Sequence, residues 1–86
     1  MNINQLVEIV KNKLHNNIVC DNIEVEDKTF LHESHTSHDK NKFHIKLIIT
    51  SDYLKKKNKI QSTKEIYKIL EKELKYNIHS IQILIN

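Results

Sequence analysis

The sequence contains no glycine, no proline and no tryptophan, and it has a single cysteine in 86 residues. One cysteine cannot form a disulfide within the chain, which argues against a disulfide-stapled scaffold and favours a reducing compartment. No apolar run approaches the about 18 residues that a membrane-spanning helix needs. The first residues also lack a basic flank followed by an apolar region, so they do not resemble a secretory signal. We therefore expect a cytoplasmic protein that does not associate with membranes.

Arginine is absent too, so all 14 basic residues are lysine, and the formal net charge is +3. A charge of this size permits weak anion binding but does not require it. A chain of 86 residues that is 38% hydrophobic supports one domain, over residues 1–86, with one core. It leaves no room for a deep active-site cleft, and no Ser/His/Asp or Cys/His pairing is evident. The sequence therefore does not predict an enzyme.

A regular apolar pattern takes the place of the missing turn markers. The clearest strand has Phe43, Ile45, Leu47 and Ile49 alternating with other residues. The predicted elements are, in order, a helix over 3–15, a strand within 18–29, a polar loop over 30–41, a strand over 43–50, a short turn near 52–55, a helix over 62–75 and a strand over 78–85.

The second helix is predicted to begin at Ser62, which Glu65 follows at the spacing of a capping box. A helix between two strands favours a parallel, right-handed crossover. We therefore expect an α+β fold of order α-β-β-α-β, with a mixed three-stranded sheet and the helices on one face. The residues expected in its core are Val7, Val10, Ile66, Ile69 and Leu70.

Four stretches, by their order and spacing, resemble the BolA family over nearly the whole chain. They are Ile23–Thr29 (IEVEDKT), Phe43–Asp52 (FHIKLIITSD), Ile66–Leu74 (IYKILEKEL) and Ile78–Ile81 (IHSI). The last is similar to the family's most characteristic position, a histidine that leads into the final strand. The resemblance implies a single BolA-like domain with a class II KH-like fold and a non-enzymatic role.

The resemblance also implies a partner, a monothiol glutaredoxin, with which the chain would form a heterodimer and share a [2Fe–2S] cluster. Such a protein would serve in iron–sulfur cluster assembly or trafficking, or in iron sensing. The family's metal ligands map to His79 and, behind the first strand, to His32, with His35 and His38 as alternatives. A glutaredoxin cysteine and a glutathione thiolate would supply the rest. The isolated chain is thus expected to be monomeric, to hold no cluster and to fold without metal.

Six histidines are present, and their expected roles differ. His79 begins the last predicted strand in phase with Ile81, where a histidine alone would more often cap a backbone carbonyl; the resemblance favours ligation. Imidazole ligates iron only when neutral, so the cluster should become more labile as the pH falls. Imidazoles in place of thiolates should also raise its reduction potential. His15 suits the dipole at a helix end, and His44 is expected on the open sheet face. Cys20 is interpreted as a small, partly buried hydrophobe.

Two features depart from the family's pattern. Ser62-Thr63 replaces the Arg-His pair that usually enters the long helix, so the contribution of that pair is lost or replaced. The loop is also a few residues longer than usual and carries extra histidines.

A KH-type nucleic-acid module has the same order of elements and provides the alternative function, a nucleic-acid-binding regulator. KH binding needs a Gly-x-x-Gly loop, and this chain has neither glycine nor arginine. The Lys55–Lys59 run is interpreted as a solvated loop. Nucleic-acid binding is therefore the less favoured function.

Overall fold

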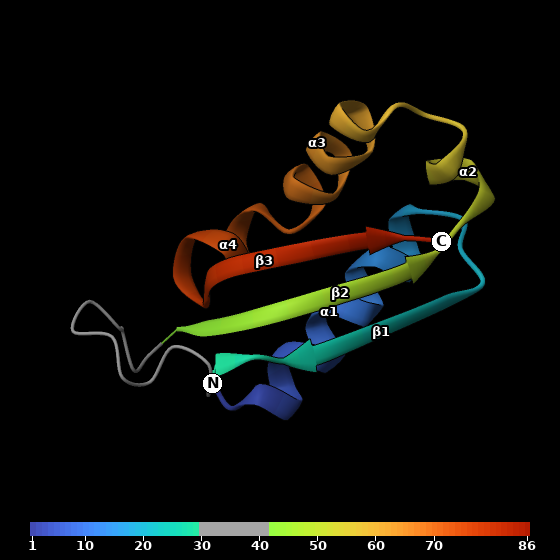
Figure 1. Ribbon diagram of the computed structural model, residues 1–86. Coiled ribbons are helices and arrows are strands. Elements are labelled where there is room, and N and C mark those ends of the chain that lie inside the picture. Colours follow the sequence, from blue (N-terminus) through green and yellow to red (C-terminus); the bar gives the residue numbers. More distant parts are fainter. Residues whose placement is uncertain (30–41) are drawn as a thin grey trace.

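The computed structural model describes residues 1–29 and 42–86 (Figure 1). Its elements are α1 (Ile3–Asn17), β1 (Asn22–Asp27), β2 (Phe43–Thr50), α2 (Asp52–Lys55), α3 (Lys59–Ile69), α4 (Glu71–Tyr76) and β3 (Ile78–Ile85). The predicted bounds of β2 and β3 are confirmed, as is the short turn at 52–55. Helix α1 extends two residues beyond its predicted end, and β1 is shorter than the segment predicted to contain it. Among the described residues, no helix is both long and apolar enough to cross a membrane.

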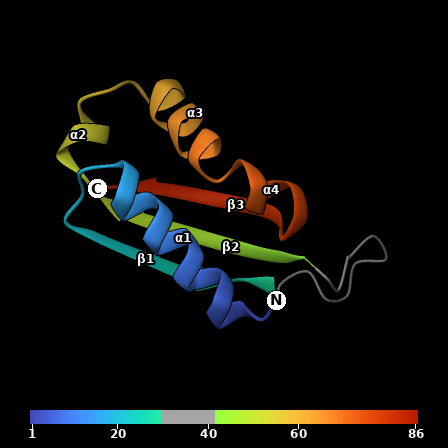
Figure 2. The ribbon, with the colours of Figure 1, turned by 180° about the vertical axis from the view of Figure 1, so that it is seen from behind.

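The three strands form one mixed sheet in the order β1-β2-β3. Strand β2 is antiparallel to β1, where Val25 lies opposite Leu47, and parallel to β3, where Ile83 lies beside the same Leu47. Figure 1 shows the sheet from the side that none of the described helices covers, and Figure 2 shows α1 crossing the other face. The predicted α+β fold, with α-β-β-α-β order, is confirmed.

One apolar core fills the space between the helices and the covered face of the sheet. Both α1 and α3 contribute to it together with alternate residues of β2, which places these helices on the same face. The buried apolar residues are Leu6, Val10, Leu14, Ile18, Ile23, Ile45, Leu47, Ile49, Leu54, Ile66, Leu70 and Ile78. Val10, Ile66 and Leu70 are therefore buried as predicted. Val7 and Ile69 are only half-buried, because they flank the apolar stripes of their helices rather than lie at the centre.

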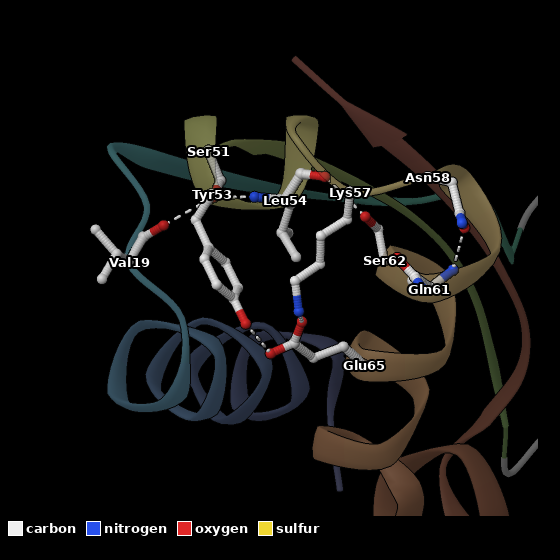
Figure 3. A network of polar contacts seen from close by, with 9 residues as sticks. All are labelled: Val19, Ser51, Tyr53, Leu54, Lys57, Asn58, Gln61, Ser62 and Glu65. Carbon is white, nitrogen blue, oxygen red and sulfur yellow. Dashed lines mark hydrogen bonds and ion pairs between the residues drawn. The ribbon is translucent and has the colours of Figure 1, made fainter.

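The N-terminus of α3 was predicted wrongly. The helix begins at Lys59, and its cap is Asn58, whose side chain accepts a hydrogen bond from Gln61 N (2.9 Å). Ser62 lies inside the helix and is buried, and its hydroxyl donates to Leu54 O at 2.8 Å (Figure 3). The Ser62 hydroxyl thus joins α3 to α2 instead of capping a helix end. Sequence spacing alone cannot distinguish these two roles.

The predicted helix over 62–75 is also not continuous. It is divided at Leu70, whose φ of −97° and ψ of 18° end α3 and begin α4. Glu73 of α4 faces inward, and only 3% of the residue is exposed. Lys13 Nζ of α1 donates to Glu73 Oε2 at 2.7 Å, and within the described part of the chain Glu73 Oε1 has no hydrogen-bond partner. One ion pair therefore ties α1 to α4 at the margin of the core.

A second polar cluster joins α2 to α3. Glu65 Oε1 accepts from the Tyr53 hydroxyl and Oε2 accepts from Lys57 Nζ, both at 2.8 Å (Figure 3). Lys57 Nζ also lies 4.5 Å from the centre of the Tyr53 ring. The hydrogen bond from Lys57, helped by that from Tyr53, lowers the pKa of Glu65 below its ordinary value. The same bond to Glu65 raises the pKa of Lys57.

The contribution of Glu65 to stability should therefore depend on pH. Its pKa is lower in the folded chain than in the unfolded chain, so the stabilisation is present above the unfolded value, about 4.3, and is lost as the pH falls through the folded value. Glu65→Gln is expected to lower the melting temperature near neutral pH, with a difference from wild type that shrinks below about pH 4. Thermal unfolding followed by circular dichroism between acid and neutral pH measures this difference. Glu71→Gln, at an exposed position of α4, is the control. A difference that does not change with pH would contradict the assignment.

Candidate metal-binding site at the start of the last strand

Strand β3 begins with a bulge, and the bulged residue is His79. Phe43 of β2 pairs with Ile78, but the next residue, His44, pairs with Ser80, so β3 has one extra residue between them. The alternation in the sequence predicts that His79 lies on the same face of the sheet as Ile81. This prediction is wrong, because the extra residue of the bulge reverses the alternation. Ile81 lies beside the core residue Ile45, whereas the His79 ring stacks on His44, on the other side of the sheet. His79 is exposed.

His44 is the residue of this site that sequence analysis missed. It was expected on the open face, and its place in the alternation agrees, yet it is only 5% exposed. Its ring centroid lies 4.8 Å from that of His79 with 26° between the planes, and its Nδ1 lies 2.7 Å from Ser80 Oγ. An open depression of about 250 Å³ adjoins it, lined by Lys28, His44, Ile45, Lys46, Ser80, Ile81 and Gln82.

The described residues that flank segment 30–41 lie next to this bulge. On the β1 side, Lys28 N donates to His44 O (2.7 Å), and Thr29 Oγ1 accepts from His44 N (3.1 Å). On the β2 side, Phe43 N donates to Asn77 O (2.8 Å). The chain thus leaves and re-enters the sheet at the end where β3 begins. Asp27 Oδ1 in turn accepts from the Thr29 hydroxyl at 2.6 Å, which holds the Thr29 side chain at the end of β1.

The loop candidates His32, His35 and His38 lie outside the described residues. The structure therefore places His79 and both flanks of segment 30–41 together, and it does not test whether a loop histidine approaches His79. In ranges 1–29 and 42–86, no group of three or more His, Cys, Asp or Glu residues is placed to hold a metal ion.

Cys20 and His15 lie at the opposite end of the sheet. Asp21, next to Cys20, donates its N–H to Thr50 O at the C-terminal end of β2, whereas His79 lies at the N-terminal end of that strand. Cys20 Sγ is 3.4 Å from His15 Nδ1, and its side chain is half-buried against the core. Burial, and next the charge of Asp21, raise the pKa of the Cys20 thiol, which disfavours the thiolate that metals require. This environment agrees with the interpretation of Cys20 as a partly buried hydrophobe.

The lysine run connects α2 to α3 and borders a second depression, of about 290 Å³. Its lining residues are Leu54, Lys55, Lys57, Lys59, Ser62, Thr63, Ile83, Leu84 and Ile85. The charge of Lys57 is already balanced by Glu65, at 2.8 Å. Lys55 and Lys59 are exposed. Ser62-Thr63, at the place where the resemblance expects an Arg-His pair, contributes no charge, and the Ser62 hydroxyl is buried and bound to Leu54 O. The surface offers few cationic groups for a phosphate backbone.

Comparisons with known proteins agree on one family. Residues 14–86 match the family model described as BolA-like protein. Among solved structures, the chain is similar to the BolA domain of SufE1 from Arabidopsis thaliana, with a TM-score of 0.79 and 27% identity over 100% of this chain and 93% of that chain. BolA1 from Arabidopsis thaliana gives 0.77 and 20% over 92% and 87% of the two chains. BolA1 protein from Mus musculus gives 0.73 and 15% over 92% and 62%. The last two likenesses concern the fold alone. A comparison with curated proteins found no match.

Proposed function

Because this chain belongs to the BolA-like family, we propose that it is a non-enzymatic adaptor that binds a monothiol glutaredoxin and shares a [2Fe–2S] cluster with it. The BolA-like family is not a known enzyme family, and a BolA-type role follows from membership. Cluster sharing, the glutaredoxin partner and action in the cytosol are the proposed refinements of that role.

The observation that carries the proposal is the position of His79. Its imidazole is exposed on a bulge, at the sheet end where Thr29 and Phe43 flank the histidine-bearing segment. His32 is the third residue after Thr29 in the sequence, a distance of at most about 10 Å for an extended chain. His79 and one loop imidazole are therefore proposed as the ligands that this chain contributes, with His32 preferred over His35 and His38.

The chemistry of an imidazole pair supports a shared cluster rather than a resident one. A [2Fe–2S] cluster takes four terminal ligands. Two imidazoles on one iron leave the other iron without a terminal ligand from this chain. The glutaredoxin cysteine and a glutathione thiolate would complete that iron, so that the cluster bridges the two proteins. The cluster is thus cargo held at the interface, and the fold of this chain, with its continuous apolar core, does not depend on it.

Co-expression with a monothiol glutaredoxin and glutathione tests the proposal. We expect a brown heterodimer whose visible circular dichroism differs from that of the glutaredoxin purified alone, because imidazoles replace thiolates on one iron. The chain expressed without the partner should be colourless and monomeric. A colourless mixture that does not co-purify would overturn the proposal.

Nucleic-acid binding remains the alternative and has less support. Its best surface is the depression beside Lys55 and Lys59, where Lys57 is paired with Glu65. The exposed lysines of that run, Lys55, Lys56 and Lys59, give a small electrostatic contribution compared with the phosphate contacts of typical nucleic-acid-binding proteins.

A further inference from the structure

His44 is not one of the proposed ligands, yet its ring contacts His79 and Ser80. We infer that His44 is a positioning residue for His79: its buried ring holds the exposed His79 ring in one orientation on the bulge. The inference rests on the proposed function, because it assigns a residue that prepares the proposed ligand. It concerns a contact within this chain that exists before any partner binds.

The first support is the difference in burial between the two rings. His44 is 5% exposed, whereas His79 is exposed, so one ring is fixed by its surroundings and the other is largely in solvent. An exposed histidine on a strand end normally samples several rotamers, which a ligand must give up on binding. The separation of 4.8 Å and the angle of 26° are those of stacked aromatic rings. Stacking on a fixed ring restricts His79 without covering it.

The second support is that His44 contacts both residues at the bulge on β3. Its ring face meets His79, and its Nδ1 lies 2.7 Å from the hydroxyl of Ser80, the next residue. Ser80 is also the register partner of His44. One side chain therefore fixes the place at which the extra residue enters β3. If the bulge moved toward the N-terminus of β3, His79 would pair with Phe43 and turn toward the core face.

The third support is the attachment of His44 itself. Its backbone N–H and C=O are bound to Thr29 Oγ1 and Lys28 N, at the end of β1. His44 thus connects the flank of segment 30–41 with the bulge that presents His79. Residues that orient metal ligands from behind typically change metal affinity by 10- to 100-fold when they are removed.

The test compares substitutions that separate the contacts. His44→Leu removes the aromatic ring and the bond to Ser80, His44→Phe keeps an aromatic ring, and Ser80→Ala removes only the hydroxyl. His15→Leu, on the exposed end of α1, is the matched control. Nuclear magnetic resonance of the isolated chain reads the His79 ring signals and the nuclear Overhauser effects between the rings at positions 44 and 79. The lifetime of the cluster in the glutaredoxin complex is measured in parallel.

We expect His44→Leu to change the His79 ring signals and to shorten the cluster lifetime by about 10- to 100-fold. The affinity for cluster-free glutaredoxin should be unchanged. In His44→Phe, which keeps an aromatic ring, the change in the His79 signals and the loss of cluster lifetime should both be smaller than in His44→Leu. Ser80→Ala should cause only a mild change in each. Unaltered His79 signals in His44→Leu, or a lifetime that falls only as the melting temperature falls, would overturn the inference.

The resonance measurement needs no partner, so the two proposals fail separately. If no complex ever holds a cluster, the proposed function fails, and the His79 signals still report whether His44 positions that ring. If the cluster depends on His79 but not on His44, the proposed function stands and this inference is wrong.

Discussion

Replacing His79 by alanine is expected to change the visible spectrum of the glutaredoxin complex and to shorten the lifetime of its cluster at least about tenfold. Loss of a residue that only supports a ligand already costs about that much, and loss of a ligand should cost more. The apo fold should remain nearly intact, because His79 is exposed and lies on a bulge outside the apolar core. Circular dichroism in the visible range follows the cluster, and thermal unfolding of the isolated chain follows the fold. His15→Ala serves as the control.

The proposed loop ligand should behave differently from His79. His32→Ala is expected to have the same effect, and a weaker one if His35 or His38 substitutes for it. A variant with alanine at His79, His32, His35 and His38 should lose the mixed cluster altogether. If that fourfold variant formed a complex with ordinary spectra and lifetime, ligation by these residues would be refuted, and binding would rest on protein–protein contacts alone.

Lys13→Met is expected to lower the free energy of unfolding by about 2 kcal/mol, because it leaves the buried Glu73 carboxylate without its cation. The range for fully buried pairs is higher, but 37% of the Lys13 side chain is exposed to water, which reduces the effect. Glu73 is 3% exposed, and its second oxygen already lacks a partner within residues 1–29 and 42–86. The carboxylate is therefore costly to bury once the ammonium is gone.

A double-mutant cycle gives this prediction its sharpest form. Adding Glu73→Leu to Lys13→Met should restore stability to the wild-type value or above it, since an apolar side chain suits the position better than an unpaired carboxylate. Urea denaturation at neutral pH measures all the variants. Lys11→Met on the same helix is the control. If Lys13→Met cost no more than Lys11→Met, the pair would be an ordinary weak surface pair.

The sequence predicts best the elements whose signal is local. The bounds of β2 and β3 follow from the alternation of apolar residues, which burial on one face imposes directly. The beginning of α3 was missed because Ser62 and Glu65 have the spacing of a capping box, but both form tertiary contacts instead, with Leu54 and with Lys57. The break at Leu70 was missed because the apolar stripe continues through it.

The candidate site was predicted in part. His79 was found through the resemblance, but its face was wrong, because a bulge changes the period of the strand. A signal for the bulge was present: Ile78 and Ile81 are both apolar but three residues apart, which a regular strand cannot place on one face. The stacking of His44 on His79 brings together residues far apart in the sequence, and no local pattern reports such a contact.

The hydrogen bonds on either side of segment 30–41 join residues of the sheet to one another, so sequence changes within the segment need not disturb the sheet. Lys28 and Thr29 are bound to His44, and Phe43 is bound to Asn77; none of these bonds involves a residue of the segment. By the usual loop-closure relation, doubling the number of residues between two fixed ends costs only about 0.6 kcal/mol in closure entropy. Insertions and substitutions between these anchored flanks can therefore accumulate at little thermodynamic cost while the rest of the domain stays unchanged.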